Sequence, residues 1–283
     1  MIKQLTILTL AASVLATTPL GAIAVDRSNA TLSTSGTERT LVLPASADQA
    51  PVIALGSGID PETGAVVEGY AIIHYKKANS HKPQHSGGGG GTTCYGYLAS
   101  GAKWKTVEPW VVNSVNNDGL AGDFVFASLA SDIAKWEDAA DGTVGNTSGV
   151  DVLGGGSSTL DTLVADQSSP DGVNEVYFAD VSSSGAIAVT IVWGVFSGPP
   201  FGRYLVEWDQ IYDDVDYDWS SAGETGKMDF ENIATHELGH SVGMSDLYTT
   251  SCSEETMYGY GANGETKKQD LNGGDIAGMN KLY

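Results

Sequence analysis

The amino-acid sequence predicts an α+β fold, and two sets of segments carry that prediction. Four short segments have the alternating or wholly apolar pattern of strands, and they span residues 104–112, 176–181, 187–193 and 204–212. Three longer segments repeat apolar residues at helical spacing, and they span residues 123–139, 229–243 and 270–283. The chain of 283 residues is long enough for one domain with a sizeable core.

The chain begins with the pattern of a secretory signal peptide. Lys3 precedes an apolar run over residues 5–16, and Ala22 and Ala24 form an A-x-A cleavage site. We therefore expect removal of residues 1–24 and secretion to the extracellular space. No other uninterrupted apolar segment approaches the roughly 20 residues that a membrane helix needs.

Residues 25–91 are predicted to form an N-terminal extension. This segment is rich in Ser, Thr, Ala and Gly, and residues 66–75 within it have the pattern of a strand. Five consecutive glycines, at residues 87–91, predict a flexible linker before a domain over residues 92–283. The chain's other histidines are His74, His81 and His85. Two of them lie near the linker and could bind metal, but an exposed polar linker explains those two better.

The net charge of −21, from 35 acidic and 14 basic residues, excludes one class of partner. A surface this acidic repels polyanions, so we expect no nucleic acid to bind. Residues 171–175 and 213–218 are acidic clusters that offer the oxygen ligands calcium prefers. A solvated acidic loop explains each cluster equally well, so structural Ca²⁺ stays an open alternative.

The most informative motif is His236-Glu237-Leu238-Gly239-His240. Residues four apart share a helix face, so His236 and His240 can direct nitrogen atoms at one zinc ion. Glu237 lies beside that face, where its carboxylate can act on a water molecule without being a ligand. This pattern is typical of a hydrolytic zinc site with Glu237 as the catalytic base.

The flanking sequence fits a helix that carries this motif. Asp229 can cap it, and Phe230, Ile233 and Leu238 give it an apolar face. Gly243 stands where a helix commonly ends in a residue with positive φ. The turn that follows can bring Asp246 back toward the metal as a third ligand.

The pattern HExxHxxGxxD over residues 236–246 resembles the zinc signature of the metzincin metalloendopeptidases, and the surrounding sequence is most similar to the matrixin-like branch. The resemblance covers about residues 104–283 and is densest after Met228. It implies a zinc-dependent endopeptidase acting on protein or peptide substrates. It also maps the third zinc ligand onto Asp246, where most matrixins carry a histidine.

The same resemblance implies a fold and several structural roles. The metzincin-like domain has a twisted, mostly parallel sheet, an active-site helix, a Met-turn beneath the zinc and a C-terminal helix. Met257 would be the residue of the Met-turn, and the segment 204–212 would be the edge strand that lines the substrate cleft. The extension over residues 25–91 would be a candidate propeptide.

The two cysteines, Cys94 and Cys252, allow two interpretations. In a secreted protein an isolated pair is most simply a disulfide. The alternative is that Cys94 caps the zinc, as in the cysteine switch of vertebrate matrixins, although the sequence around it does not match that switch.

The sequence leaves two rival functions open. A gluzincin-type aminopeptidase would take its third ligand from a later glutamate, with Glu254, Glu255 and Glu265 as candidates, but it leaves Gly243 and Met257 unexplained. A catalytically inactive binding or adhesion protein would keep the metzincin fold without turnover, and the presence of Glu237 argues against it.

Overall fold

The structure, a computed structural model, describes residues 39–44, 47, 50–76 and 93–283. The signal peptide expected at residues 1–24 and the glycine linker at 87–91 lie outside these residues. Every described residue belongs to one compact unit, Ser35–Tyr283.

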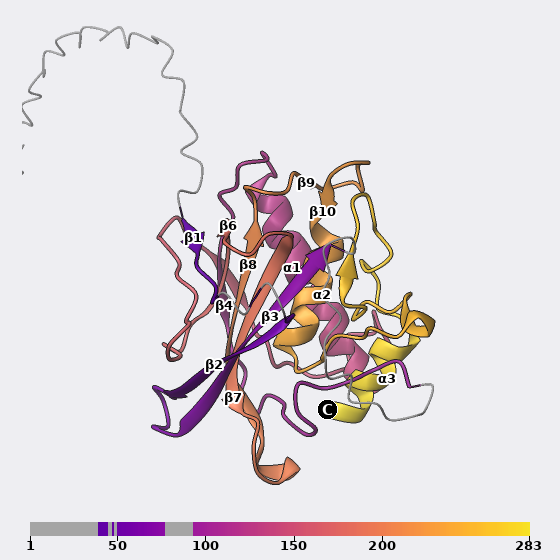
Figure 1. The fold of residues 1–283 in the computed structure, drawn as a ribbon. Coiled ribbons are helices and arrows are strands. Elements are labelled where there is room, and N and C mark those ends of the chain that lie inside the picture. Colours follow the sequence, from indigo (N-terminus) through magenta and orange to yellow (C-terminus); the bar gives the residue numbers. More distant parts are fainter. Residues whose placement is uncertain (1–38, 45–46, 48–49, 77–92) are drawn as a thin grey trace, which may run out of the picture. The chain divides into compact units, whose positions relative to one another are not determined.

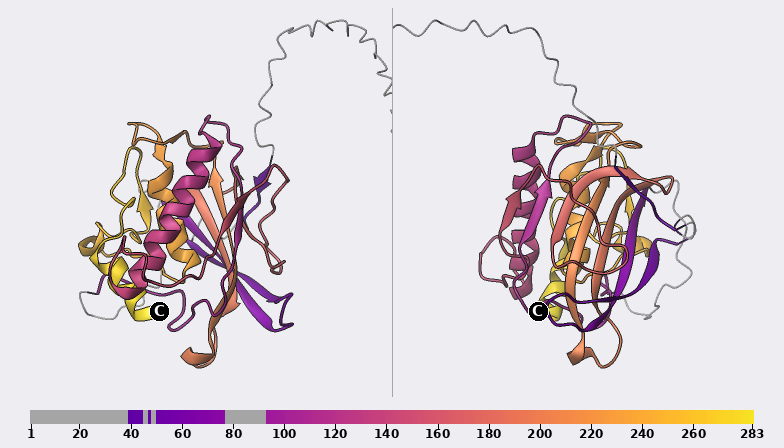
Figure 2. Two further views of the ribbon diagram at one scale, coloured as in Figure 1. Left: turned by 180° about the vertical axis from the view of Figure 1, so that it is seen from behind. Right: turned by 90° about the vertical axis from the view of Figure 1, so that its left-hand side faces the viewer.

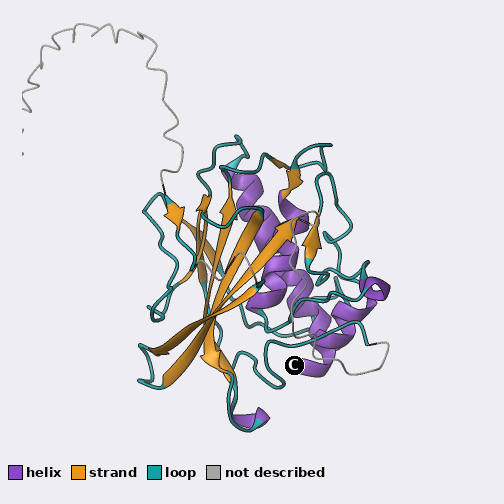
Figure 3. Ribbon diagram, viewed as in Figure 1, coloured by secondary structure: helices purple, strands orange, loops and turns teal. Residues whose placement is uncertain are grey.

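The described part of the chain is built on a nine-stranded sheet (Figures 1 and 3). Its strands are β1 (Thr40–Leu41), β2 (Val52–Ile59), β3 (Val66–Lys76), β4 (Trp110–Asn113), β5 (Gly156–Ser158), β6 (Asn174–Val181), β7 (Ala186–Val195), β8 (Tyr204–Asp213) and β11 (Tyr260–Gly261). They are ordered β11-β3-β7-β8-β6-β4-β5, with β1 paired to β6 and β2 paired to β3. A separate parallel pair is formed by β9 (Trp219–Ser220) and β10 (Met228–Asp229).

The sheet is mixed. Strands β5, β4, β6 and β8 run parallel to one another, as the resemblance implied. Strand β7 runs antiparallel to both β8 and β3, and β3 runs antiparallel to β2. The predicted strands at 176–181, 187–193 and 204–212 are confirmed with slightly wider limits, whereas only the end of the segment 104–112 is a strand, in β4.

The expectation that residues 204–212 form a half-exposed edge strand is wrong. Strand β8 lies inside the sheet, between β7 and β6. Its polar residues Glu207 and Asp209 are each only 1% exposed. Asp209 accepts hydrogen bonds from the amides of Asp166 and Glu175 (2.8 and 3.1 Å). The polar positions of the alternating pattern therefore face a covering loop rather than water.

Strands β2 and β3 come from residues expected in the N-terminal extension. The strand predicted at 66–75 is confirmed as β3. It pairs with β7 from Glu68 opposite Gly194 to Tyr75 opposite Ala186. The extension thus contributes strands to the same sheet as residues 92–283.

Three α-helices cover one face of the sheet (Figure 2). They are α1 (Gly122–Asp138), α2 (Phe230–Ser241) and α3 (Gly273–Leu282), and the shorter 3₁₀ helices are η3 (Ala139–Asp141), η4 (Pro200–Gly202) and η5 (Thr250–Cys252). Helix α2 packs against both α1 and β7. The indole of Trp136 in α1 donates a hydrogen bond to the Thr235 carbonyl in α2 (2.7 Å), which fixes the two helices to each other.

Cys94 and Cys252 form a disulfide. The bond confirms the simpler interpretation of the cysteine pair, and it leaves Cys94 without a thiol that could cap a zinc ion. Among the described residues, no helix is long and apolar enough to cross a membrane.

Candidate active site

Helix α2 presents the two motif histidines on one face. The Asp229 carboxylate begins the helix by accepting the Asn232 amide (2.9 Å), as predicted for a cap. The apolar face that contains Phe230, Ile233 and Leu238 is fully buried in the core. Packing on that side fixes the rotation of the helix about its axis and therefore the direction of the histidines.

Three donor atoms converge beside this helix. Nε2 of His236 and Nε2 of His240 lie 3.1 and 3.5 Å from Oδ1 of Asp246. All three atoms are buried, and none has a hydrogen-bond partner. Buried polar atoms are almost always paired, so three unpaired acceptors at one point have the arrangement of a cation site. The structure therefore brings together the three residues predicted as metal ligands, His236, His240 and Asp246.

Backbone carbonyls hold both imidazole rings in one tautomer. Nδ1 of His236 lies 2.6 Å from the Thr256 carbonyl, and Nδ1 of His240 lies 3.0 Å from the Met244 carbonyl. A carbonyl can only accept, so each Nδ1 carries the proton and each Nε2 keeps a lone pair. Burial lowers the pKa of His236 to about 3, which favours the neutral imidazole that binds metals.

A tight turn returns the chain from α2 to Asp246. Gly243 has φ +101°, and a Cβ there would lie 2.9 Å from the Ala102 carbonyl oxygen, so the position requires glycine. The Tyr248 hydroxyl donates to Oδ2 of Asp246 (2.8 Å), which leaves Oδ1 for the site. Sequence reasoning did not identify Tyr248, although its place two residues after a proposed ligand was a usable signal.

Met257 lies directly beneath the turn of α2 that carries His236 and His240. A Cβ on Gly239 would be 2.1 Å from the Met257 sulfur, so the sulfur fills the space where this glycine has no side chain. The Asp275 carboxylate in α3 accepts the Thr256 and Met257 amides (2.7 and 3.2 Å) and so positions this loop. The place of Met257 fits a Met-turn, which stays a prediction.

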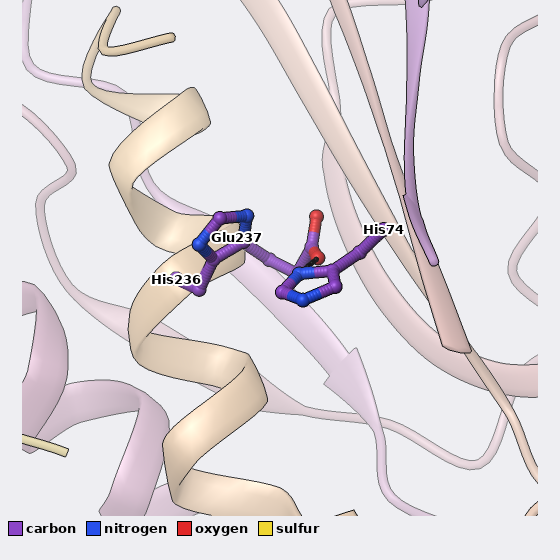
Figure 4. A group of neighbouring side chains, drawn as sticks. All are labelled: His74, His236 and Glu237. Carbon is purple, nitrogen blue, oxygen red and sulfur yellow. Dashed lines mark hydrogen bonds and ion pairs between the residues drawn. The ribbon is translucent and has the colours of Figure 1, made fainter. Parts of the chain in front are cut away.

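Glu237 is fully buried and points from α2 toward His74 of β3 (Figure 4), and two side chains hold its carboxylate. Its Oε1 lies 3.1 Å from Nδ1 of His74, and its Oε2 accepts the Thr190 hydroxyl (2.6 Å). Burial raises the pKa of Glu237 to about 7. The His74 ring also packs edge-on against His236, with ring centroids 4.0 Å apart.

Lys268 completes this buried group. Its ammonium lies 3.3 Å from Nε2 of His74 and donates to the Tyr258 carbonyl, and burial lowers its pKa to about 8. Sequence reasoning missed His74, Thr190 and Lys268 as neighbours of the site. They are far from the motif along the chain, and only the strand pairing of β3 with β7 brings the first two to Glu237.

The glutamates of the rival aminopeptidase interpretation lie elsewhere. Glu255 accepts the amides of Gly274 and Asp275 at the start of α3 (2.8 and 3.3 Å). In the part of the chain that is described, no group with metal-binding geometry contains Glu254, Glu255 or Glu265. The histidines His81 and His85 lie outside the described residues.

The two acidic clusters that offer ligands for calcium, residues 171–175 and 213–218, differ in structure. The Asp213 carboxylate accepts hydrogen bonds from backbone amides, including those of Val215 and Asp216 (2.9 and 2.8 Å). Asp171 instead lies near Asp166 and Glu207, with one oxygen of each within 4.8 Å of the others. Calcium at either cluster stays a prediction.

The comparisons with known proteins agree with this geometry. A search of curated proteins gave no match. Residues 204–283 match the sequence model of the Matrixin family. The matched segment contains β8, α2, the loop of Met257 and α3, and matrixins are zinc metallopeptidases, so the match supports a hydrolase that depends on zinc. Over this C-terminal segment, the chain is similar to the matrixins.

Proposed function

We propose that the chain is a secreted zinc-dependent endopeptidase in which His236, His240 and Asp246 hold the metal and Glu237 is the general base. One observation carries the proposal: three buried acceptor atoms without partners face one point, beside a buried carboxylate. Two neutral imidazoles and one carboxylate are a donor set that suits zinc. The predicted signal peptide and the disulfide support secretion.

Each residue of the site has a distinct part in peptide hydrolysis. When bound, zinc supplies the Lewis acidity that acidifies water and polarises a peptide carbonyl. Glu237 accepts the proton of the attacking water and later donates a proton to the departing amine nitrogen. The carbonyls of Thr256 and Met244 keep the two imidazoles in the orientation that binds metal.

The test compares the wild type with Glu237→Gln and Asp246→Ala in a quenched-peptide assay, before and after limited proteolysis, with zinc measured by metal analysis. We expect Glu237→Gln to keep its zinc and lose turnover, by a factor of about 10² or more. Asp246→Ala should lose zinc. Glu254→Gln is the control, because its side chain is 78% exposed.

Three results would contradict parts of this proposal. Wild-type turnover in Glu237→Gln would refute the general base, and full zinc occupancy in Asp246→Ala would mean that another residue is the third ligand. A wild-type protein that binds zinc but cleaves no peptide under either condition would favour the alternative of an inactive binding protein with a metzincin fold.

A further inference from the structure

The loop over residues 164–173 folds around two carboxylates of β8. Oε2 of Glu207 accepts the Gly172 amide, and Oδ2 of Asp209 accepts the Asp166 amide (2.8 Å). Both glutamate and aspartate are buried beneath the loop. The backbone of the loop is therefore held by side chains of a central strand of the sheet.

These carboxylates lie on the face of the sheet away from the α-helices. Trp208, between Glu207 and Asp209 in the chain, packs in the core cluster that contains Phe230 of α2. Successive side chains of a strand point to opposite faces, and the three helices cover the face of Trp208 (Figure 2). The sheet thus separates Glu207 and its neighbours from the proposed zinc site.

Two buried oxygen atoms beneath the loop have no hydrogen-bond partner. They are Oε1 of Glu207, a residue that is only 1% exposed, and Oδ2 of Asp166. The carboxylates of Asp166, Asp171 and Glu207 each place one oxygen within 4.8 Å of the other two. Because buried polar atoms are almost always paired, an unpaired carboxylate oxygen at this depth has the setting of a metal ligand.

The negative charge of this group is not balanced by a basic side chain. Among the residues that the structure describes, no Lys, Arg or His forms an ion pair with Asp166, Asp171, Glu207 or Asp209. Burial of ionised carboxylates without a counter-charge is costly, and coordination to a metal ion is one of the ways in which proteins offset that cost.

The donor atoms decide which class of ion fits. The group of Asp166, Asp171 and Glu207 offers carboxylate oxygens alone, whereas the proposed zinc site offers two imidazoles. Ca²⁺ prefers oxygen ligands, and it takes about six to eight of them. Asp171 is exposed, so one side of the group is open for the ion to enter and for water to complete its coordination.

We propose that Asp166, Asp171 and Glu207 form a calcium site that fastens the loop over residues 164–173 to β8. The site is separate from the proposed zinc site and does not depend on the proposed peptidase function. The same loop also contacts two other strands, because Ser169 accepts the Ile59 amide of β2 (3.1 Å) and the Trp193 indole of β7 donates to the Asp166 carbonyl (2.8 Å). Calcium would therefore stabilise the packing of this loop on three strands.

The indole of Trp193 also provides a local spectroscopic probe. Tb³⁺ takes the place of Ca²⁺ in oxygen sites, and it luminesces when a nearby tryptophan is excited. Because the Trp193 ring is hydrogen-bonded to the carbonyl of one proposed ligand, Asp166, Tb³⁺ bound at this site should show strong sensitised emission. Excess Ca²⁺ should displace it and remove the emission.

The experiment uses full-length protein loaded with zinc, so that the zinc site is filled, in calcium-free buffer. Tm is measured as Ca²⁺ is added, and Tb³⁺ emission is measured separately, for the wild type, Glu207→Gln and Asp171→Asn. Both substitutions remove one charge and nearly preserve side-chain size. Asp161→Asn is the matched control, because Asp161 is an exposed residue of the same connection between β5 and β6 and lies outside the group.

We expect Ca²⁺ to raise the Tm of the wild type in a saturable way. Loss of one charged ligand should weaken the affinity of each variant for Ca²⁺ and for Tb³⁺ by about tenfold or more, and the control should match the wild type. A wild type without a saturable rise in Tm and without displaceable Tb³⁺ emission would overturn the proposal and indicate that Asp166 and Glu207 share a proton. Equal affinities in the wild type and both variants would also overturn it, since the ion would then bind elsewhere. Asp171→Asn, at an exposed position, keeps the test decisive if Glu207→Gln does not fold.

Discussion

Tyr248 donates its hydroxyl to the Asp246 carboxylate, with 2.8 Å between the two oxygen atoms. The bond uses Oδ2 and turns Oδ1 toward the imidazoles of His236 and His240. The side chain of an aspartate ligand can rotate away from a metal. A neighbour that fixes the orientation of its carboxylate therefore raises metal affinity.

Tyr248→Phe should therefore weaken zinc binding without abolishing it. Loss of a hydrogen bond to a metal ligand typically costs about 10- to 100-fold in affinity. Competition with a chelating dye measures the effect. Tyr260→Phe is the control, because this ring packs on Tyr248 with centroids 5.2 Å apart, whereas the hydroxyl that donates to Asp246 belongs to Tyr248. Equal affinity in Tyr248→Phe and the wild type would show that the hydroxyl does not orient the carboxylate.

Asp275→Ala should destabilise the domain. The Asp275 carboxylate is fully buried and accepts the amides of Thr256, Met257 and Asn272. Leaving a buried amide without an acceptor costs about 1–3 kcal/mol, so we expect a loss of at least that size in the free energy of unfolding. Urea unfolding of zinc-free protein measures it. The exposed control Glu254→Ala should change stability by no more than about 0.5 kcal/mol, and a similar value for Asp275→Ala would contradict the prediction.

The raised pKa of the Glu207 carboxyl predicts that the folded protein loses stability at high pH. Burial raises its pKa from 4.5 to about 9, with nearby Asp166 and Asp171 adding to the rise. The folded protein thus keeps a proton that the unfolded chain has released. The stabilising contribution is complete below about pH 4.5 and is lost as the pH rises through about 9.

Glu207→Gln imitates the protonated side chain and tests this sign. We expect its Tm to match the wild type near pH 5 and to exceed it increasingly toward about pH 9. Glu224→Gln, with a side chain that is 56% exposed, is the control. The measurements include a chelator, because a cation bound by Asp166, Asp171 and Glu207 would favour the ionised form. A difference in Tm that does not change with pH would count against the raised pKa.

Removal of the disulfide should also lower stability. Cys94 and Cys252 are 158 residues apart in sequence, and cross-links that close long loops typically contribute about 2–5 kcal/mol. The double variant Cys94→Ser with Cys252→Ser should therefore unfold at a lower urea concentration. Thiol titration of unfolded, non-reduced wild type is the companion measurement, and two reactive thiols there would rule out the bond.

The grouping of the three proposed metal ligands could be predicted from sequence because they are local. His236 and His240 are one helical turn apart, and Gly243 permits the bend that returns Asp246 to them. Each of these features depends on helix geometry and turn chemistry within eleven residues. The strand pattern at 66–75 was equally local, and β3 confirmed it.

What surrounds Glu237 could not be predicted from sequence. His74 reaches it only because β3 pairs with β7 in one register, and strand pairing between distant segments leaves no local pattern. The error at β8 has a similar origin. Glu207 and Asp209 looked like solvent-facing positions, whereas a covering loop supplies amides to their carboxylates. Alternation identifies the two faces of a strand but not what lies on each.

The sulfur of Met257, which fills the space left by Gly239, has a consequence for chemical damage. Oxidation of methionine to the sulfoxide adds a polar oxygen to the side chain. Met257 is 0% exposed, so peroxide cannot reach its sulfur while the domain is folded, and the close packing against Gly239 leaves no room there for the extra atom. An oxidant would therefore modify only molecules that have already opened, and once modified they could not close around a metal again.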